Sequence, residues 1–252
     1  MEEYKEIERS IIKKYRKEIW AKFVKACKEY ELINEGDKVM VCISGGKDSF
    51  LLAKCVEELQ KHGGVKFYAF YVCMNPGYND VNKEMILNNA KKLNINLEMF
   101  DSDIFDVANM LNEKSPCYMC ARMRRGYLYN KAKELGCNKI ALGHHFDDAI
   151  ETFMMNLFIE GRIGCFSPRS YLSRKDLTVI RPMALAPEKE IIRAANRAGL
   201  PIVKNPCPVD GATARQKMKN LLNTLEESNQ GVKQRIFGAM RRAGVDGWQF
   251  RV

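Results

Sequence analysis

The most constraining feature of this chain is a glycine turn that lies between two apolar segments. Lys38–Ile43 is typical of a β-strand, and Phe50–Ala53 is typical of the first turns of a helix. The turn between them contains Ser44, Gly45, Gly46, Lys47, Asp48 and Ser49. Two adjacent glycines permit backbone dihedrals and a close approach that a Cβ atom would prevent. The N–H groups and the positive dipole end of the helix then face an anion, so this segment predicts a phosphate-binding turn.

The side chains of the turn suit the same ligand. Lys47 supplies a cation, and the hydroxyl groups of Ser44 and Ser49 supply hydrogen-bond donors. Asp48 begins the predicted helix, where a carboxylate either caps backbone N–H groups or binds Mg²⁺. The turn is not a Walker A loop, because that motif has an additional glycine before the Gly-Lys pair.

Short apolar segments alternate with amphipathic segments along most of the chain. Strands are predicted at 38–44, 66–72, 96–100, 139–143 and 178–181. Helices are predicted at 48–62, 79–93, 104–111, 118–135, 147–160 and 188–198. This alternation indicates an α/β fold with a doubly wound parallel sheet of about five strands. Ligands bind at the carboxyl ends of the strands in such sheets, which is where the glycine turn lies.

The chain divides into three predicted parts. Residues 1–35 form an N-terminal helical extension, predicted as one long helix to about residue 34, whose apolar stripe is expected to pack on the following domain. Residues 36–200 form the nucleotide-binding domain, and residues 201–252 form a cysteine-containing loop followed by a basic helical tail. The basic side chains of the tail suit either contact with a nucleic acid or a solvated surface; they are Lys217, Lys219, Lys233, Arg235, Arg241 and Arg242.

Composition narrows the class of protein. The chain has 41 Lys and Arg against 31 Asp and Glu, a net charge of +10 that favours a polyanionic partner. It has neither a long uncharged apolar stretch nor a secretory leader pattern, which predicts a cytoplasmic protein that makes no membrane contact. Nine cysteines in a reducing compartment favour metal or catalytic use for some of them over a disulfide framework.

Three of these cysteines are candidates for a metal centre. Cys117 and Cys120 form a C-x2-C pair at the start of a predicted helix, and Cys207 lies between two prolines. The spacing fits a [4Fe–4S] cluster with one iron that lacks a protein ligand, half of a zinc site, a redox dithiol or structural thiols. Cys42, Cys55, Cys73 and Cys137 lie in apolar segments and are predicted to be core residues.

Four motifs in order give a family resemblance. The first is SGGKDS at 44–49, and the second is the C-x2-C pair followed by ARMRRGYLY at 121–129. The others are IALGHHFDDAIET at 140–152 and RPM at 181–183. Over residues 36–220 the chain resembles the tRNA 2-thiocytidine synthetase group of the PP-loop ATP pyrophosphatases, which have an adenine nucleotide alpha hydrolase-like fold. The resemblance implies ATP-dependent replacement of oxygen by sulfur on a cytidine of the tRNA anticodon loop.

The resemblance also implies site residues and partners. A [4Fe–4S] cluster would be bound by Cys117, Cys120 and Cys207, which are then also catalytic residues. The ATP-binding residues would be Ser44, Gly45, Gly46, Lys47, Asp48, Ser49, Gly143 and His144. Lys47 and Asp147 are the other catalytic candidates, with Mg²⁺ as a further cofactor. The implied partners are tRNA, a sulfur donor system (a cysteine desulfurase or sulfide) and a second copy of the chain in a homodimer.

Several alternatives stay open at this stage. Some members of the group have a second C-x2-C pair at the last cysteine site, whereas this chain has Asp210 there. His144 and His145 either contact the nucleotide or complete a hydrogen-bond network, and Asp147 is alternatively a first-turn acid of a helix. The rival functions are the same chemistry on uridine or on a small molecule, and a non-enzymatic iron–sulfur module that binds RNA.

Overall fold

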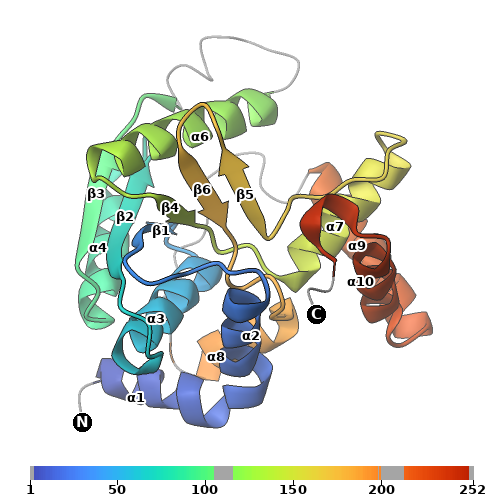
Figure 1. Ribbon diagram of the computed structural model, residues 1–252, viewed down its shortest axis with the longest axis horizontal. Helices are drawn as coiled ribbons and strands as arrows, with labels where there is room; N and C mark the ends of the chain where they lie inside the picture. Colours follow the sequence, from blue (N-terminus) through green and yellow to red (C-terminus); the bar gives the residue numbers. More distant parts are fainter. Residues whose placement is uncertain (1–2, 105–115, 198, 200–212, 250–252) are drawn as a thin grey trace.

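The computed structural model describes residues 3–104, 116–197, 199 and 213–249 (Figure 1). Its centre is a six-stranded sheet in the order β3-β2-β1-β4-β6-β5. The strands are β1 (Lys38–Ile43), β2 (Tyr68–Asn75), β3 (Leu97–Asp101), β4 (Lys139–Ala141), β5 (Arg169–Leu172) and β6 (Leu177–Ile180). All neighbouring strands are parallel except β5 and β6. The predicted α/β sheet is confirmed, but the predicted number of about five strands is wrong.

The unpredicted strand is β5, which forms an antiparallel hairpin with β6. Its side chains alternate between exposed and half-buried, and its first residue Arg169 pairs with Ile180. A four-residue strand at the edge of a sheet buries few side chains, so its sequence carries little of the apolar signal that predicted the other five.

The helices lie close to their predicted positions. They are α3 (Lys47–His62), α4 (Asp80–Lys92), α6 (Pro116–Glu134), α7 (Phe146–Phe158), α8 (Glu188–Arg197), α9 (Ala214–Ser228) and α10 (Val232–Arg242). A short 3₁₀ turn, η3 (Val245–Gly247), follows α10. The helix predicted at 104–111 falls almost wholly outside the described residues. Within the described parts of the chain, no helix is both long and apolar enough to span a membrane.

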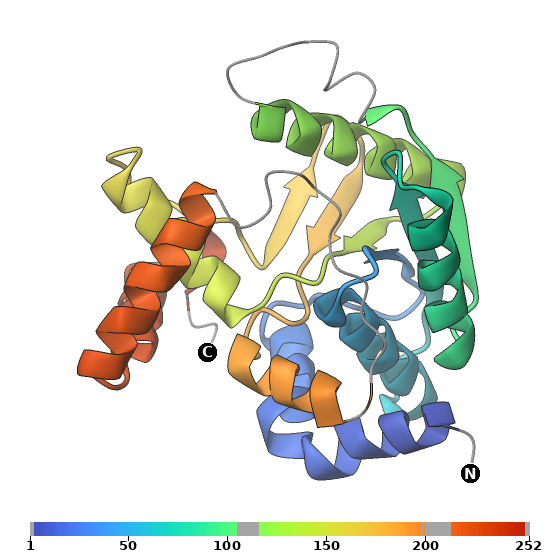
Figure 2. The same ribbon diagram turned by 180° about the vertical axis from the view of Figure 1, so that it is seen from behind.

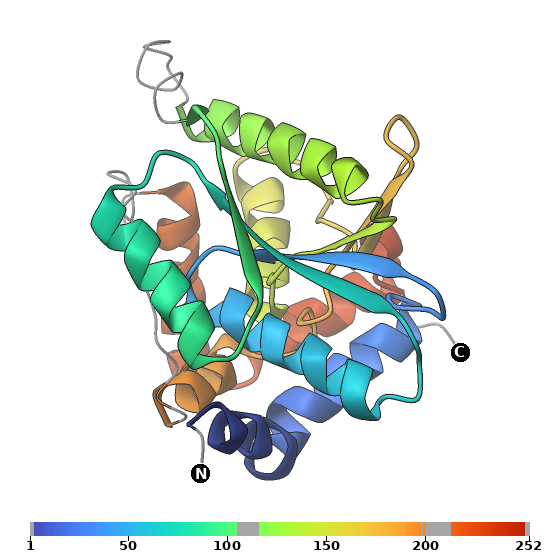
Figure 3. The same cartoon turned by 90° about the vertical axis from the view of Figure 1, so that its left-hand side faces the viewer.

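Two apolar cores cover the two faces of the sheet. On β1, Val39, Val41 and Ile43 belong to a large core that also contains buried residues of α3, α4 and α8. Met40, between them in the sequence, belongs to a smaller core with Ala132 of α6. This period of two is the alternation expected of a strand covered on both faces. Figure 3 shows α6 on one side of the sheet and α3 on the other.

The N-terminal segment is helical but not the single long helix that was predicted. It consists of α1 (Glu3–Arg9), two π-helical turns η1 (Ser10–Lys14) and η2 (Arg16–Trp20), and α2 (Ala21–Glu29). The interruption falls at Tyr15, whose φ of −104° and ψ of 24° are not helical and whose hydroxyl donates to the Arg193 carbonyl of α8. Figure 2 shows α8 beside these N-terminal helices.

The C-terminal helices α9 and α10 pack against α7. Beyond them, Trp248 is completely buried, and its ring contacts Tyr30 and Phe237 edge-on. The Trp248 indole N–H donates to the carbonyl of Phe166 at 2.6 Å. This packing brings the basic tail to the loop between β4 and α7.

Candidate active site

The glycine turn forms the expected strand-to-helix connection. Gly45 has a φ of +82°, which a residue with a Cβ adopts only at a cost, and Gly46 is the N-cap of α3. The Ser49 hydroxyl donates to the Gly46 carbonyl at 2.9 Å and accepts from the Ser44 N–H at 3.1 Å. Among the described residues, no side chain caps the first N–H groups of α3. The serine at position 49 therefore holds the turn together, and the backbone N–H groups are left to bind the anion.

Lys47 leaves the turn toward two carboxylates. Its Nζ lies 3.1 Å from Asp48 Oδ2 and 3.2 Å from Glu188 Oε1, at the N-terminus of α8. Burial opposes the charge of Lys47, but the two carboxylates outweigh burial and raise its pKa. The second oxygen of Asp48, Oδ1, is buried and lies 3.9 Å from His145 Nε2, and it accepts no hydrogen bond from the described residues. Such an oxygen is available to a metal ion or a donor group of a ligand.

The β4–α7 loop passes directly against the glycine turn. A Cβ on Gly143 would lie 3.3 Å from the Ser49 nitrogen and 3.3 Å from the Asp48 carbonyl carbon. Only a glycine fits comfortably at this distance, since few Cβ contacts are as close. Gly143, predicted from the sequence as a nucleotide-binding residue, thus brings the two loops together.

The two histidines of this loop have different surroundings. His145 is the N-cap of α7. Its ring Nδ1 accepts from the Asp148 backbone N–H at 3.3 Å, and the His145 backbone N–H donates to the Asp148 carboxylate at 2.9 Å. His144 packs on Phe166, and its buried Nδ1 has no hydrogen-bond partner. Burial lowers the pKa of His144 to about 4, so its ring is neutral at pH 7. His145 therefore has a structural role, while His144 is free to contact a ligand.

Asp147 links three helices. Its Oδ1 lies 2.9 Å from Lys233 Nζ of α10, and its Oδ2 accepts from the Glu188 N–H at 2.7 Å. The residue is 6% exposed. Both carboxylate oxygens are therefore engaged in the structure. The catalytic role predicted for Asp147 stays a prediction, and it would require Lys233 to move away.

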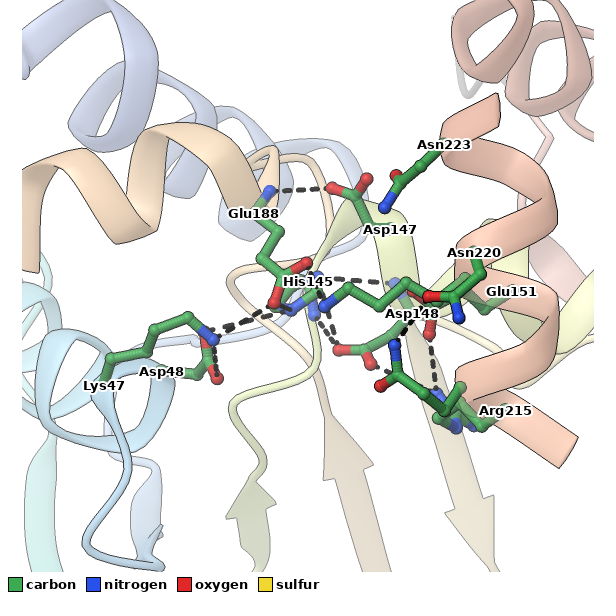
Figure 4. Close-up of polar contacts among 12 residues, drawn as sticks. Lys47, Asp48, His145, Asp147, Asp148, Glu151, Glu188, Arg215, Asn220 and Asn223 are labelled. Atoms are coloured by element: carbon green, nitrogen blue, oxygen red, sulfur yellow. Dashed lines mark hydrogen bonds and ion pairs between the residues drawn. The ribbon is translucent and has the colours of Figure 1, made fainter. Parts of the chain in front are cut away.

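Helix α9 contributes cations that the sequence did not place at the site (Figure 4). The Arg215 guanidinium lies 3.1 Å from Asp148, 3.6 Å from Glu151 and 3.1 Å from the Thr152 hydroxyl. Lys219 Nζ lies 2.6 Å from the Glu188 carboxylate. We call this set the cation–carboxylate cluster: Lys47, Arg215, Lys219 and Lys233 with Asp147, Asp148, Glu151 and Glu188.

Glu151 is the most perturbed acid of the cluster. Burial and the nearby charge of Asp148 raise its pKa to about 7, although Arg215 and Lys219 act in the opposite direction. Helical spacing alone would have found this residue, since it follows Asp147 and Asp148 by one turn of the same helix. No local signal marks Glu188 or Arg215, because their partners are 31 or more positions away in the sequence.

Helix α6 carries the described part of the cysteine motif. Cys120 is half-buried and unbonded, whereas the Cys117 side chain and the whole of Cys207 lie outside what the structure describes. Among the described residues, no three metal-binding side chains come together. One turn after Cys120, the Nε of Arg124 is buried without a hydrogen-bond partner, while Arg122 and Arg125 are exposed.

Arg181 directly follows β6, at the carboxyl end of that strand. Its guanidinium lies 4.7 Å from the centre of the Phe166 ring, and one NH group donates to the Ser167 carbonyl at 2.6 Å. Burial lowers its pKa to about 10, and its Nε has no partner. Four buried polar atoms without hydrogen-bond partners thus lie at this end of the sheet or on α6. They belong to Asp48, His144 and Arg181, which follow strands, and to Arg124 of α6.

The basic tail is less exposed than its sequence suggested. Lys219 and Lys233 form ion pairs within the cluster, and Arg241 is buried against Glu29 of α2. Of the six residues considered, Lys217, Arg235 and Arg242 are exposed to solvent without a described ion pair. The Arg235 guanidinium donates to Asn229 and Gln230 at the start of α10.

Comparison with known proteins identifies the family. The PP-loop domain profile matches residues 15–225, which is most of the chain. The chain belongs to the PP-loop family. It is 38% identical over 223 residues to the tRNA-cytidine(32) 2-sulfurtransferase of Citrifermentans bemidjiense, with 86% of each chain covered. It is 34% identical over 238 residues to tRNA-cytidine(32) 2-sulfurtransferase 1 of Francisella tularensis, covering 92% of this PP-loop chain and 88% of the relative.

A solved structure has the same fold. It is the U34-tRNA thiolase NcsA from Methanococcus maripaludis, which was determined with its [4Fe–4S] cluster. The TM-score is 0.69 at 23% sequence identity, and the match covers 88% of this PP-loop chain and 77% of the thiolase. At this identity the match supports the architecture of the sheet and helices described above.

Proposed function

We propose that the protein is an ATP-dependent tRNA thiolase that replaces the C2 oxygen of the anticodon-loop cytidine at position 32 with sulfur. The relatives named above carry this activity in their names and align over 86% or more of the chain. The observation that carries the proposal is the convergence of the glycine turn, Gly143 and the cation–carboxylate cluster at one end of the sheet. Anion-binding N–H groups and carboxylates for Mg²⁺ are what an ATP-cleaving site needs.

The proposed reaction has two steps. In the first, the C2 oxygen of the cytidine attacks the α-phosphate of ATP, and pyrophosphate leaves. In the second, reduced sulfur adds to C2, and AMP leaves with the original oxygen atom. The N–H groups of α3 and the Lys47 ammonium would stabilise the charge that develops on the departing pyrophosphate.

The polar atoms without partners fit a bound nucleotide and Mg²⁺. Asp48 Oδ1 would be a ligand of Mg²⁺, since carboxylate oxygens are preferred by this ion. The Nε groups of Arg124 and Arg181 would donate to anionic oxygens, and the neutral His144 ring would contact the nucleotide or the base. Buried polar atoms in proteins are nearly always hydrogen-bonded, so four such atoms without partners favour a site that acquires them from its substrates.

The thiol chemistry fits a [4Fe–4S] cluster. Thiolates are the usual ligands of such clusters, and we propose Cys117, Cys120 and Cys207 as the three that bind it. Cys120 is half-buried and forms no disulfide, as a ligand requires. When bound, the cluster would supply an iron without a protein ligand that accepts the sulfur atom. The sulfur donor would be a cysteine desulfurase or sulfide.

Nucleoside analysis tests the function directly. The gene is expressed in a host that lacks its own 2-thiocytidine enzyme, and tRNA nucleosides are measured by mass spectrometry. We expect 2-thiocytidine to appear only when the gene is present. A different thionucleoside would contradict the assignment to cytidine, and the absence of any thionucleoside in cells where the protein carries its cluster would contradict tRNA thiolation.

Cysteine variants test the cluster. Cys120→Ala and Cys207→Ala should each abolish the iron–sulfur absorbance and the thiolation, because each removes one of three ligands, while the affinity for ATP stays unchanged. Cys165→Ala is the matched control, since the Cys165 thiol is half-buried and donates to the Ala149 carbonyl at 3.3 Å. Full absorbance and activity in either ligand variant would show that the assigned triad is wrong.

A further inference from the structure

The N-terminal helical segment carries a dense run of positive charge. Between positions 13 and 28 the chain has seven Lys or Arg residues and one Glu. The exposed members are Lys13, Lys14, Arg16, Lys17, Lys25 and Lys28. At 1.5 Å per residue the nine residues of α2 alone are about 13 Å long, which spans more than one phosphate of a nucleic-acid strand.

These exposed bases differ from the bases near the candidate active site. Lys47, Lys219 and Lys233 each lie within 3.2 Å of a carboxylate. None of the six exposed bases of the N-terminal run forms an ion pair with a side chain in the described part of the chain. Their charge is therefore uncompensated within this part of the protein, and it produces a positive potential that attracts polyanions.

Part of this run lines an open groove of about 580 Å³ along η2 and α2. Arg16, Lys25 and Lys28 lie on its walls, and Trp20 contributes an indole ring. One face of that ring stacks on Phe23 with a centroid distance of 5.7 Å. A hollow that combines cations with an aromatic surface is typical of sites that bind nucleic acids.

One acid also lines the groove, but its charge is neutralised. The Glu29 carboxylate pairs with the Arg241 guanidinium of α10, and both residues are largely buried. The net charge of the groove walls is consequently positive. The same contact joins the groove to the C-terminal helices, whose Lys233 belongs to the cation–carboxylate cluster.

We propose that the groove bounded by Arg16, Lys25 and Lys28 binds the phosphate backbone of the tRNA substrate. The proposal rests on the proposed function and assigns a role to the N-terminal segment, for which the sequence motifs gave none. The helical segment that carries the groove also contacts α8, whose first residue, Glu188, belongs to the cluster.

The test is the salt dependence of tRNA binding. A triple variant, Arg16→Gln/Lys25→Gln/Lys28→Gln, is compared with the unmodified protein in binding a tRNA transcript at several salt concentrations. Each phosphate contact contributes about 0.9 to the slope of log affinity against log salt concentration. We therefore expect the magnitude of the slope to fall by about 2 to 3, and the affinity at physiological salt to fall about tenfold to a hundredfold.

A matched control separates the groove from net charge. Lys91→Gln/Lys92→Gln/Lys133→Gln removes three exposed lysines of α4 and α6 that also have no described ion pair. This variant should bind tRNA like the unmodified protein. Equal binding by the two triple variants would overturn the proposal. The proposal would also be overturned if the Arg16/Lys25/Lys28 variant bound tRNA normally but lost thiolation only in reactions with a protein sulfur donor. That result would indicate that the groove binds an acidic protein partner. If the unmodified protein binds no tRNA, the proposed function fails as well.

Discussion

The glycine turn and the cation–carboxylate cluster lie side by side but are built differently. The hydrogen bonds of the turn that involve its serines join residues at most five positions apart, such as Ser44 and Ser49. The ion pairs of the cluster join residues far apart in the sequence, such as Asp147 and Lys233. Local contacts form wherever the hexapeptide follows a strand, whereas the cluster exists only after α8, α9 and α10 have packed. The anion-binding half of the site is thus encoded locally and its charged half by the tertiary fold.

The two regions also differ in what they leave unsatisfied. In the described part of the chain, no side chain bonds to the first N–H groups of α3, so these groups are available to bind an anion. In the cluster each carboxylate already has a cation, although Glu151 is served only by a long contact of 3.6 Å to Arg215. Lys47 is the residue that belongs to both regions. A bound triphosphate would compete with Asp48 and Glu188 for its ammonium group.

Substitution of Lys47 gives the largest expected effect on this comparison. Lys47→Ala removes the mobile cation beside the phosphate turn, and we expect AMP formation in the presence of tRNA to slow by about 100-fold to 1,000-fold. The iron–sulfur absorbance should not change. Release of pyrophosphate measures the rate, and Lys217→Ala, an exposed lysine of α9, is the control. A loss of less than about threefold would mean that the backbone alone supports the chemistry.

Glu151 gives the next largest effect, and it depends on pH. Its pKa is about 7 in the folded protein against an ordinary value of 4.5, so the folded state binds more protons between these values. The free energy of unfolding therefore falls as the pH rises from about 4.5 to 7. The Glu151→Gln variant lacks this fall. Urea unfolding should therefore show that its free energy of unfolding, relative to that of the parent, is about 2 to 3 kcal/mol more favourable at pH 8 than at pH 5. Parallel stability curves would contradict the raised pKa.

Lys233 should have the smallest of the three effects. Lys233→Met leaves the buried Asp147 carboxylate with the Glu188 N–H as its remaining partner. Because the pair is partly exposed, we expect a loss of about 1 to 2 kcal/mol in the free energy of unfolding, less than for a fully buried pair. A double-mutant cycle with Asp147→Asn measures the coupling, and Lys217→Met is the control. Additive effects of the two substitutions would show that this ion pair does not hold α10 to α7.

Most of the fold follows from sequence pattern. The five parallel strands were predicted to within a few residues because each is an apolar segment followed by a helix. β2 extends three residues beyond its prediction, to Asn75, because the chain continues to pair with β3 there. β5 carries too little apolar signal to be recognised, and the break at Tyr15 depends on a contact with α8 that the sequence does not reveal.

The site was predictable only in its local parts. The glycine turn, Gly143 and the Asp147–Asp148 pair follow directly from motifs that end strands and begin helices. The partners Glu188 and Arg215 were missed, and Lys219 and Lys233 were expected to face either a nucleic acid or solvent, because only tertiary packing brings them to α7. The roles predicted for Asp147 and for the three cysteines stay predictions.

The burial of Trp248 has a practical consequence. The chain has two tryptophans, and the second, Trp20, is half-buried in the wall of the N-terminal groove. The protein thus contains two intrinsic fluorophores in contrasting surroundings. A quencher in solution, such as iodide or acrylamide, would reach the indole of Trp20 and not that of Trp248. The quenchable fraction of the emission therefore reports on the groove, and the remaining fraction reports on the docking of the C-terminal end.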